Sequence, residues 1–154
     1  MKFWFDTEFI EDGKTIDLIS IGIVSEDGRE FYAINAECDY SKASAWVREN
    51  VLVHIKAYTE NYKTRAEIRD AILQFIGNDE PEIWAYYADY DWVALCQLFG
   101  TMMDLPKGWP MYCRDLKQLA GNLPLPEQGK GEHHALLDAR WTRDAWLYAH
   151  GDGA

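Results

Sequence analysis

"KFWFDTEFIEDGKTIDLISIGIVSEDGREFYAIN", residues 2–35, holds three apolar runs separated by two Asp-Gly pairs. The runs cover 2–9, 15–24 and 29–35, and the pairs are Asp12-Gly13 and Asp27-Gly28. Asp-Gly between runs of apolar and β-branched residues is a strong hairpin signal. We therefore predict an antiparallel meander of three strands. Its first two strands are apolar at nearly every position, which is typical of a sheet covered on both faces.

The rest of the chain alternates between helical and strand patterns. Residues 64–77 give the clearest helix, with Thr64 and Glu67 as a capping box and Gly77 as the C-cap. We predict further helices at 41–55, 91–102, 114–122 and 134–150, a loop at 123–132, and strands at 82–87 and 110–113. This order predicts an α/β fold with a mixed five-stranded sheet flanked by helices. No repeat or linker divides the chain, so we expect residues 1–154 to form a single domain.

The charge balance limits the kind of partner. The chain has 15 Lys and Arg against 26 Asp and Glu, a net charge of −11. Such an excess argues against a non-specific grip on long duplex nucleic acid, although a small site for a nucleic-acid end remains compatible with it. Three widely spaced cysteines without a CxxC pair indicate a reducing compartment. With no signal-peptide pattern and no run long enough to span a membrane, we expect a cytoplasmic protein with no membrane partner.

Four acidic residues stand in apolar surroundings. Asp6 and Glu8 end the first strand and, two positions apart, project from the same face, with Thr7 on the other. Asp91 lies where a strand gives way to a helix, and Asp138 lies early in the last helix. Carboxylates near a core need partners because a lone buried charge is costly, and few cations are nearby in the sequence. A divalent metal ion that prefers oxygen ligands, such as Mg²⁺, is the simplest partner for these carboxylates.

Two histidines precede the last acidic residue and could supply a general base. A histidine suits proton transfer near neutral pH. His134 and Asp138 are four residues apart and would share a helix face, whereas His133 would lie at the helix entrance. The spacing leaves the choice between the two histidines open.

"FDTEF", "AYYADYDWVAL" and "HHALLDA" together resemble the three motifs of the DEDDh superfamily of 3′-to-5′ exonucleases, which has a ribonuclease H-like fold. The motifs occur in the right order across nearly the whole chain. The resemblance implies His133 as general base, because the family pattern is H-x-x-x-x-D, and Glu8 as both catalytic residue and ligand. It implies that two Mg²⁺, for which Mn²⁺ can substitute, are held by Asp6, Glu8, Asp91 and Asp138.

"FDTEFIEDG" and the short chain more closely resemble the small bacterial polyadenylate-specific 3′-exoribonucleases, the ribonuclease AS type, which are related to ribonuclease T and oligoribonuclease. This resemblance implies hydrolysis from single-stranded RNA 3′ ends with release of nucleoside 5′-monophosphates. It also implies a preference for adenylate and a homodimer.

Two segments depart from the family pattern. Many relatives have T-x-G-L after D-x-E, with an apolar residue wedged against the terminal base; here Phe9 or Ile10 would take that place, beside Thr7 as a further substrate contact. Tyr86-Tyr87 replaces the common His-Asn before the second motif. Asp89 lies close to Asp91, and we interpret it as the N-cap of the following helix.

Other functions stay open at this point. They are a metal-dependent endonuclease of the same fold, a DNA exonuclease, and an interaction protein without enzymatic activity. The histidine of H-x-x-x-x-D favours an exonuclease over an endonuclease. The complete set of four acids and a histidine counts against a decayed site.

Overall fold

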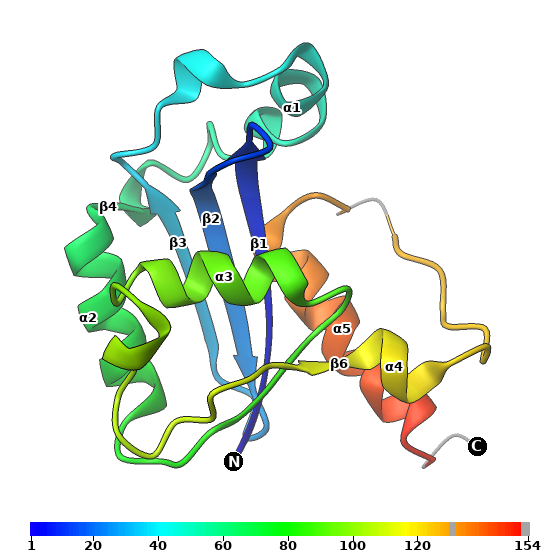
Figure 1. Ribbon diagram of the computed structural model, residues 1–154. Coiled ribbons are helices and arrows are strands. Elements are labelled where there is room, and N and C mark those ends of the chain that lie inside the picture. Colours follow the sequence, from blue (N-terminus) through cyan, green and yellow to red (C-terminus); the bar gives the residue numbers. More distant parts are fainter. Residues whose placement is uncertain (130–131, 152–154) are drawn as a thin grey trace.

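The computed structural model describes residues 1–129 and 132–151 and contains one mixed sheet flanked by helices (Figure 1). Its strand order is β4-β3-β2-β1-β5-β6. The strands are β1 (Lys2–Glu11), β2 (Ile16–Ser25), β3 (Glu30–Asn35), β4 (Tyr62–Lys63), β5 (Glu82–Ala85) and β6 (Arg114–Asp115). The α-helices are α1 (Ala45–Asn50), α2 (Arg65–Ile76), α3 (Asp89–Gln97), α4 (Leu116–Ala120) and α5 (Ala135–Ala149). The predicted α/β class and the three-strand meander are confirmed, but the sheet has six strands rather than five.

Two local predictions are wrong. The helix expected at 41–55 is three short helices, η1 (Tyr40–Lys42), α1 and η2 (Leu52–His54), because Asp39 and Ser44 each cap a new start. The strand expected at 110–113 forms only later, at Arg114–Asp115. The extra strand β4 pairs with β3 over only two residues, too few for an alternating pattern to reveal it. Two further short helices, η3 (Thr59–Asn61) and η4 (Met102–Asp104), lie in connections.

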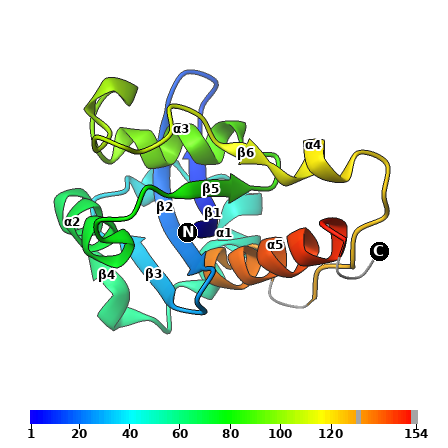
Figure 2. The same ribbon diagram turned by 90° about the horizontal axis from the view of Figure 1, so that it is seen from below.

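Helices cover both faces of the sheet (Figures 1 and 2). Phe3 and Phe5 of β1 point to the side of α2 and α3, where they join a core that includes Ile72 and Leu95. Trp4, between them, points to α5 and packs against Trp146 with ring centroids 5.4 Å apart. This alternation assigns every second residue of β1 to the α5 side. None of the helices among the described residues is both long enough and apolar enough to cross a bilayer.

Gly22 lets the start of α5 lie directly against the sheet. It stands in the middle of β2, opposite Asp6 of β1. A Cβ at Gly22 would lie 2.5 Å from both the Cα and the backbone nitrogen of Leu136, closer than atoms pack. Glycine therefore permits a contact between the backbones of β2 and α5, as expected where another chain segment approaches a strand closely.

Gly22→Ala should destabilise the fold because the added methyl would collide with helix backbone. Overpacking of this kind costs about 1–3 kcal/mol in the free energy of unfolding. Denaturant melts of Gly22→Ala and Gly129→Ala test this, since Gly129 has an ordinary φ and no atom within 4 Å of its Cβ position. Equal stability of the two variants would contradict the proposed contact.

Candidate metal centre

β1 and α5 bring the first and third acidic motifs together. Asp6 and Glu8 lie on the α5 side of β1, before the strand is interrupted by a bulge between Glu8 and Phe9. Asp138 is a buried residue in the first turn of α5. Carboxylate oxygens of Glu8 and Asp138 lie within 4.8 Å of each other. Strand alternation and the close approach of α5 at Gly22 together account for this meeting.

Asp91 reaches β1 by a different route. β5 pairs with β1 only from Lys2 to Trp4, which leaves the backbone of Thr7 free on that edge. The chain then turns into α3, whose first turn contains Asp91. The Asp91 Oδ1 atom accepts hydrogen bonds from the backbone N–H of Thr7, at 3.0 Å, and from the Thr7 hydroxyl. These bonds fix the Asp91 carboxylate at the point where β1 presents Asp6 and Glu8.

The four carboxyl groups share a poorly solvated, negatively charged environment. Burial and the neighbouring Asp91, Glu8 and Asp138 raise the pKa of Asp6 well above its usual range. Burial and the carboxylate of Asp138 raise the pKa of Glu8 to about 9. Burial also raises the pKa of Asp91 to about 7, against the opposing hydrogen bonds from Thr7. The pKa of Asp138 is raised by burial as well. Each shift indicates that burial and repulsion outweigh the stabilisation that the protein gives to the charged carboxylates.

The residues present fit a metal ion. Among the described residues, no Lys or Arg forms an ion pair with any of the four carboxylates. The Asp6 Oδ2 atom is buried and has no hydrogen-bond partner within residues 1–129 and 132–151. Carboxylate oxygens of Glu8 and Asp138 lie within 4.8 Å of each other and of a ring nitrogen of His133; of these three residues, the two carboxylates are the candidate ligands for a hard cation. Buried oxygens that lack donors are the ligands that hard divalent cations prefer.

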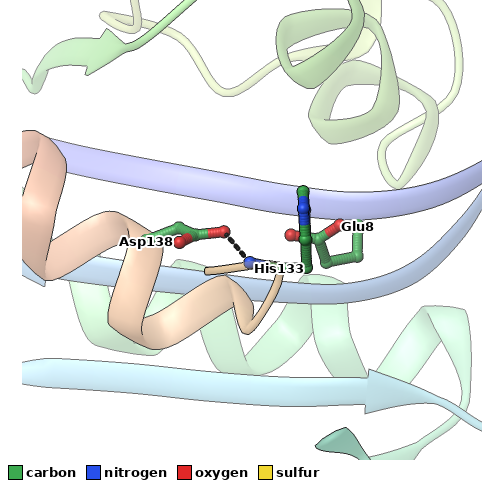
Figure 3. Close-up of side chains that lie close together, drawn as sticks. All are labelled: Glu8, His133 and Asp138. Carbon is green, nitrogen blue, oxygen red and sulfur yellow. Dashed lines mark hydrogen bonds between the residues drawn. The ribbon is translucent and has the colours of Figure 1, made fainter. Parts of the chain in front are cut away.

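His133 lies beside this cluster, at the entrance to α5 (Figure 3). Its backbone N–H donates a hydrogen bond of 2.9 Å to Asp138 Oδ2. Its backbone has φ 70°, in the left-handed region that non-glycine residues seldom occupy. The imidazole is partly exposed and contacts the ring of Trp46 edge-on, with centroids 4.9 Å apart. The ring therefore stands next to the carboxylates while keeping access to solvent.

His134 has a structural position instead. It is the N-cap of α5, and its Nδ1 atom accepts from the backbone N–H of Leu137 at 3.5 Å. Its ring stacks on Tyr32 with centroids 4.7 Å apart and is buried, which lowers its pKa. The i, i+4 argument for pairing His134 with Asp138 is wrong because the N-cap backbone is extended rather than helical.

The three expected substrate contacts differ in exposure. Thr7 is buried and its hydroxyl is occupied by Asp91, while Ile10 is buried in the cluster beneath α1 and η2. Phe9 is partly exposed, and its ring centroid lies 5.9 Å from that of Tyr90. Of these side chains, Phe9 is the one with surface available to a ligand. Contacts of all three with substrate stay predictions.

The N-cap assignment of Asp89 is wrong. The N-cap of α3 is Ala88, and Asp89 is the first helical residue, exposed and without a capping hydrogen bond. The turn before α3 is instead held by Asp115, which accepts from the backbone N–H groups of Tyr87 and Ala88. Sequence reasoning missed Asp115, although an Asp directly before the short helix at Leu116 is a typical N-cap signal. Sequence reasoning also missed Trp46, because a single tryptophan in the sequence does not indicate that its ring will contact His133.

The shifted pKa values predict how the metal-free protein responds to pH. Glu8 has a folded pKa of about 9 against 4.5 unfolded, so folding favours its protonated form. Its contribution to stability is thus fully present below about 4.5 and is lost as pH rises to about 9. We expect the Tm in EDTA to fall over this interval more steeply for wild type than for Glu8→Gln, which mimics the protonated side chain. Parallel Tm profiles would contradict the assigned repulsion.

Comparisons with known proteins give a consistent match over most of the chain. Residues 1–150 match the family model described as the 3′-5′ exoribonuclease Rv2179c-like domain. Two curated relatives, the 3′-5′ exoribonucleases Rv2179c and MT2234.1 from two strains of Mycobacterium tuberculosis, are each 45% identical over 147 residues. Each alignment covers 91% of this chain and 88% of the relative.

Proposed function

Because the chain belongs to the Rv2179c-like 3′-5′ exoribonuclease domain family, we propose that it hydrolyses phosphodiester bonds one at a time from the 3′ end of single-stranded RNA. The products are nucleoside 5′-monophosphates. Residues 1–154 act as one DEDDh-type exonuclease domain with two Mg²⁺, for which Mn²⁺ can substitute. The observation that best supports this reaction is that carboxylates from three elements, Asp91, Glu8 and Asp138, raise the pKa of Asp6, whose buried Oδ2 atom has no hydrogen-bond donor among the described residues.

In this proposal the four carboxylates are the metal ligands. The ions would be held by Asp6, Glu8, Asp91 and Asp138. When bound there, two divalent ions would supply charge stabilisation for the attacking and leaving oxygens of the displacement. The Thr7 hydrogen bonds orient the Asp91 carboxylate, so this part of the site is preorganised. The raised pKa values imply that ion binding also displaces protons from the cluster.

His133 is the residue that takes the proton from the attacking water. Its imidazole stands beside Glu8 and is partly open to solvent, so a proton can pass from the site to bulk water. The bond from its backbone N–H to Asp138 links the position of the base to that of a proposed ligand. A base held in this way contributes by being within reach at the moment of attack.

Adenylate preference, a homodimer and a cytoplasmic location complete the proposal. They rest mainly on the resemblance to polyadenylate-specific enzymes. Phe9 beside Tyr90 offers an aromatic surface for a terminal base. Stacking alone discriminates poorly among bases, so adenine selection needs hydrogen bonds to the base edge. The free thiols of Cys38, Cys96 and Cys113 suit a reducing cytoplasm.

RNA labelled at its 5′ end tests the reaction and its direction. With Mg²⁺ we expect a ladder that shortens by one nucleotide at a time, while the label stays on the shrinking RNA. A 3′-phosphate should block the start, because the site would be shaped around a free terminal hydroxyl. Circular RNA cut as fast as linear RNA would instead identify an endonuclease.

Homopolymers separate the base preference from the activity itself. We expect poly(A) to be degraded faster than poly(U) or poly(C) of equal length, and faster than the matching DNA. Initial rates measured under one set of conditions give the comparison. Equal rates on the three RNAs would remove the adenylate claim and leave the exoribonuclease claim intact.

A further inference from the structure

Asp115 is the point where β6, α4 and the turn before α3 meet. Its Oδ1 and Oδ2 atoms accept the backbone N–H groups of Tyr87 and Ala88, each at 3.1 Å. Oδ1 also accepts the backbone N–H of Lys117 at 2.8 Å and so caps α4. One partly buried carboxylate thus holds three backbone donors from two segments that are 27 or more residues apart in sequence.

The turn that Asp115 holds has an unfavourable backbone conformation. Tyr87 has φ 51°, and its side chain is 62% exposed. A left-handed conformation costs free energy for any residue with a Cβ and persists only where surrounding contacts enforce it. The Tyr87 ring contacts its neighbour Tyr86, with centroids 4.5 Å apart, but this contact between adjacent residues does not anchor the turn to another segment. Two hydrogen bonds to Asp115 hold this turn against β6 directly.

The same turn determines where Asp91 lies. Tyr87 and Ala88 lead into α3, whose first turn contains Asp91. A change in the backbone conformation of Tyr87 would therefore shift the start of the helix. On its other side Asp91 is joined to Thr7 by hydrogen bonds across 84 residues of sequence. A connected path therefore runs from Asp115 through the turn to Asp91 and β1.

We propose that Asp115 is a positioning residue for the metal centre: by holding the left-handed Tyr87 turn, it places Asp91 against Thr7 and beside Asp6. This rests on the proposed function only in taking Asp91 as a ligand. Asp115 itself contacts backbone amides and need not touch metal or RNA. Partners that orient a ligand are often as important to a metal site as its ligands.

Amide hydrogen exchange tests the positioning step without metal or substrate. In Asp115→Ala, the amides of Tyr87 and Ala88 should lose protection, and so should the amide of Thr7, whose acceptor is Asp91. Asp89→Asn is the matched control, because it removes an exposed carboxylate from the same helix start, and this side chain forms no hydrogen bond among the described residues. If Asp115→Ala fails to fold, Asp115→Asn replaces it. The single amide oxygen can keep the bonds from Tyr87 and Lys117 that Oδ1 accepts, so protection should then be lost at Ala88 and Thr7. Unchanged Thr7 protection in a folded variant would overturn the proposal.

Metal affinity and kinetics give the second readout. Asp115→Ala should weaken Mg²⁺ binding about 10–100-fold, as loss of an orienting partner typically does. The same variant should lower kcat with little change in the KM for RNA, whereas Asp89→Asn should keep both close to wild type. A weakening that Asp89→Asn shares would indicate simple loss of negative charge and would overturn the positioning role.

A second substitution tests whether the left-handed turn at Tyr87 causes the effects of Asp115→Ala. Glycine adopts φ near 51° without penalty, so Tyr87→Gly added to Asp115→Ala should restore part of the lost Mg²⁺ affinity and Thr7 protection. Absence of any recovery would contradict the role of the left-handed turn. If the protein proves not to degrade RNA, the exchange and Mg²⁺ results still decide the role of Asp115, so the two failures are distinguishable.

Discussion

His133→Ala is expected to lower kcat by ~10²–10⁴-fold, the usual contribution of a general base. Mg²⁺ affinity should change little, because the bond from residue 133 to Asp138 comes from the backbone N–H, which alanine keeps. The imidazole is partly exposed, so its removal leaves the core intact. Steady-state rates on 5′-labelled RNA and calorimetric Mg²⁺ titrations give the two quantities.

His134→Ala is the comparison that tests which of the two histidines is the base. This ring is buried, caps α5 and stacks on Tyr32, so its loss should lower the free energy of unfolding. Measured well below its melting temperature, the variant should keep far more activity than His133→Ala. An inactive His134→Ala beside an active His133→Ala would show that the wrong histidine has been assigned as base.

Asp138→Asn is expected to cost on the order of 10³-fold or more in rate, because several kcal/mol of transition-state charge stabilisation depend on the metal and each 1.36 kcal/mol is tenfold. It differs from His133→Ala in also losing Mg²⁺ affinity. Asparagine keeps the size of the side chain, so the fold should survive.

The Mg²⁺ dependence of Tm distinguishes lost metal from lost folding in this variant. Wild type should gain Tm on adding Mg²⁺, since a ligand that binds only the folded state stabilises it. Asp138→Asn should gain little, while its Tm in EDTA should equal or exceed that of wild type because one repelling carboxylate is gone. An equal gain in Tm for both proteins would contradict the assignment of Asp138 as a ligand.

Local patterns predicted the features that depend on neighbouring residues. The Asp-Gly pairs placed the meander, and the capping box between Thr64 and Glu67 is present at the start of α2. The two-residue period of a strand likewise places Asp6 and Glu8 on one face of β1. These features follow from backbone geometry over a few residues, which sequence records directly.

Features that depend on distant segments could not be predicted from the sequence. β4 and β6 are two-residue strands whose pairing depends on what lies beside them. The hydrogen bonds between Thr7 and Asp91, and between Asp115 and the Tyr87 turn, join residues far apart in the chain. His134 shares the spacing of a helix face with Asp138, yet its backbone is that of a cap. Such contacts are set by tertiary packing, which no local period encodes.

Calorimetric titration of Mg²⁺ into wild type and Asp6→Ala tests the metal centre most directly. In the part of the chain that the structure describes, the buried Asp6 Oδ2 has no hydrogen-bond partner, so Asp6→Ala removes a proposed ligand without breaking a hydrogen bond to that atom. We predict two Mg²⁺ per chain in wild type, and weak or absent binding in Asp6→Ala with RNA hydrolysis lost in parallel. Undiminished Mg²⁺ binding by Asp6→Ala, or full nuclease activity of wild type in EDTA, would contradict the account.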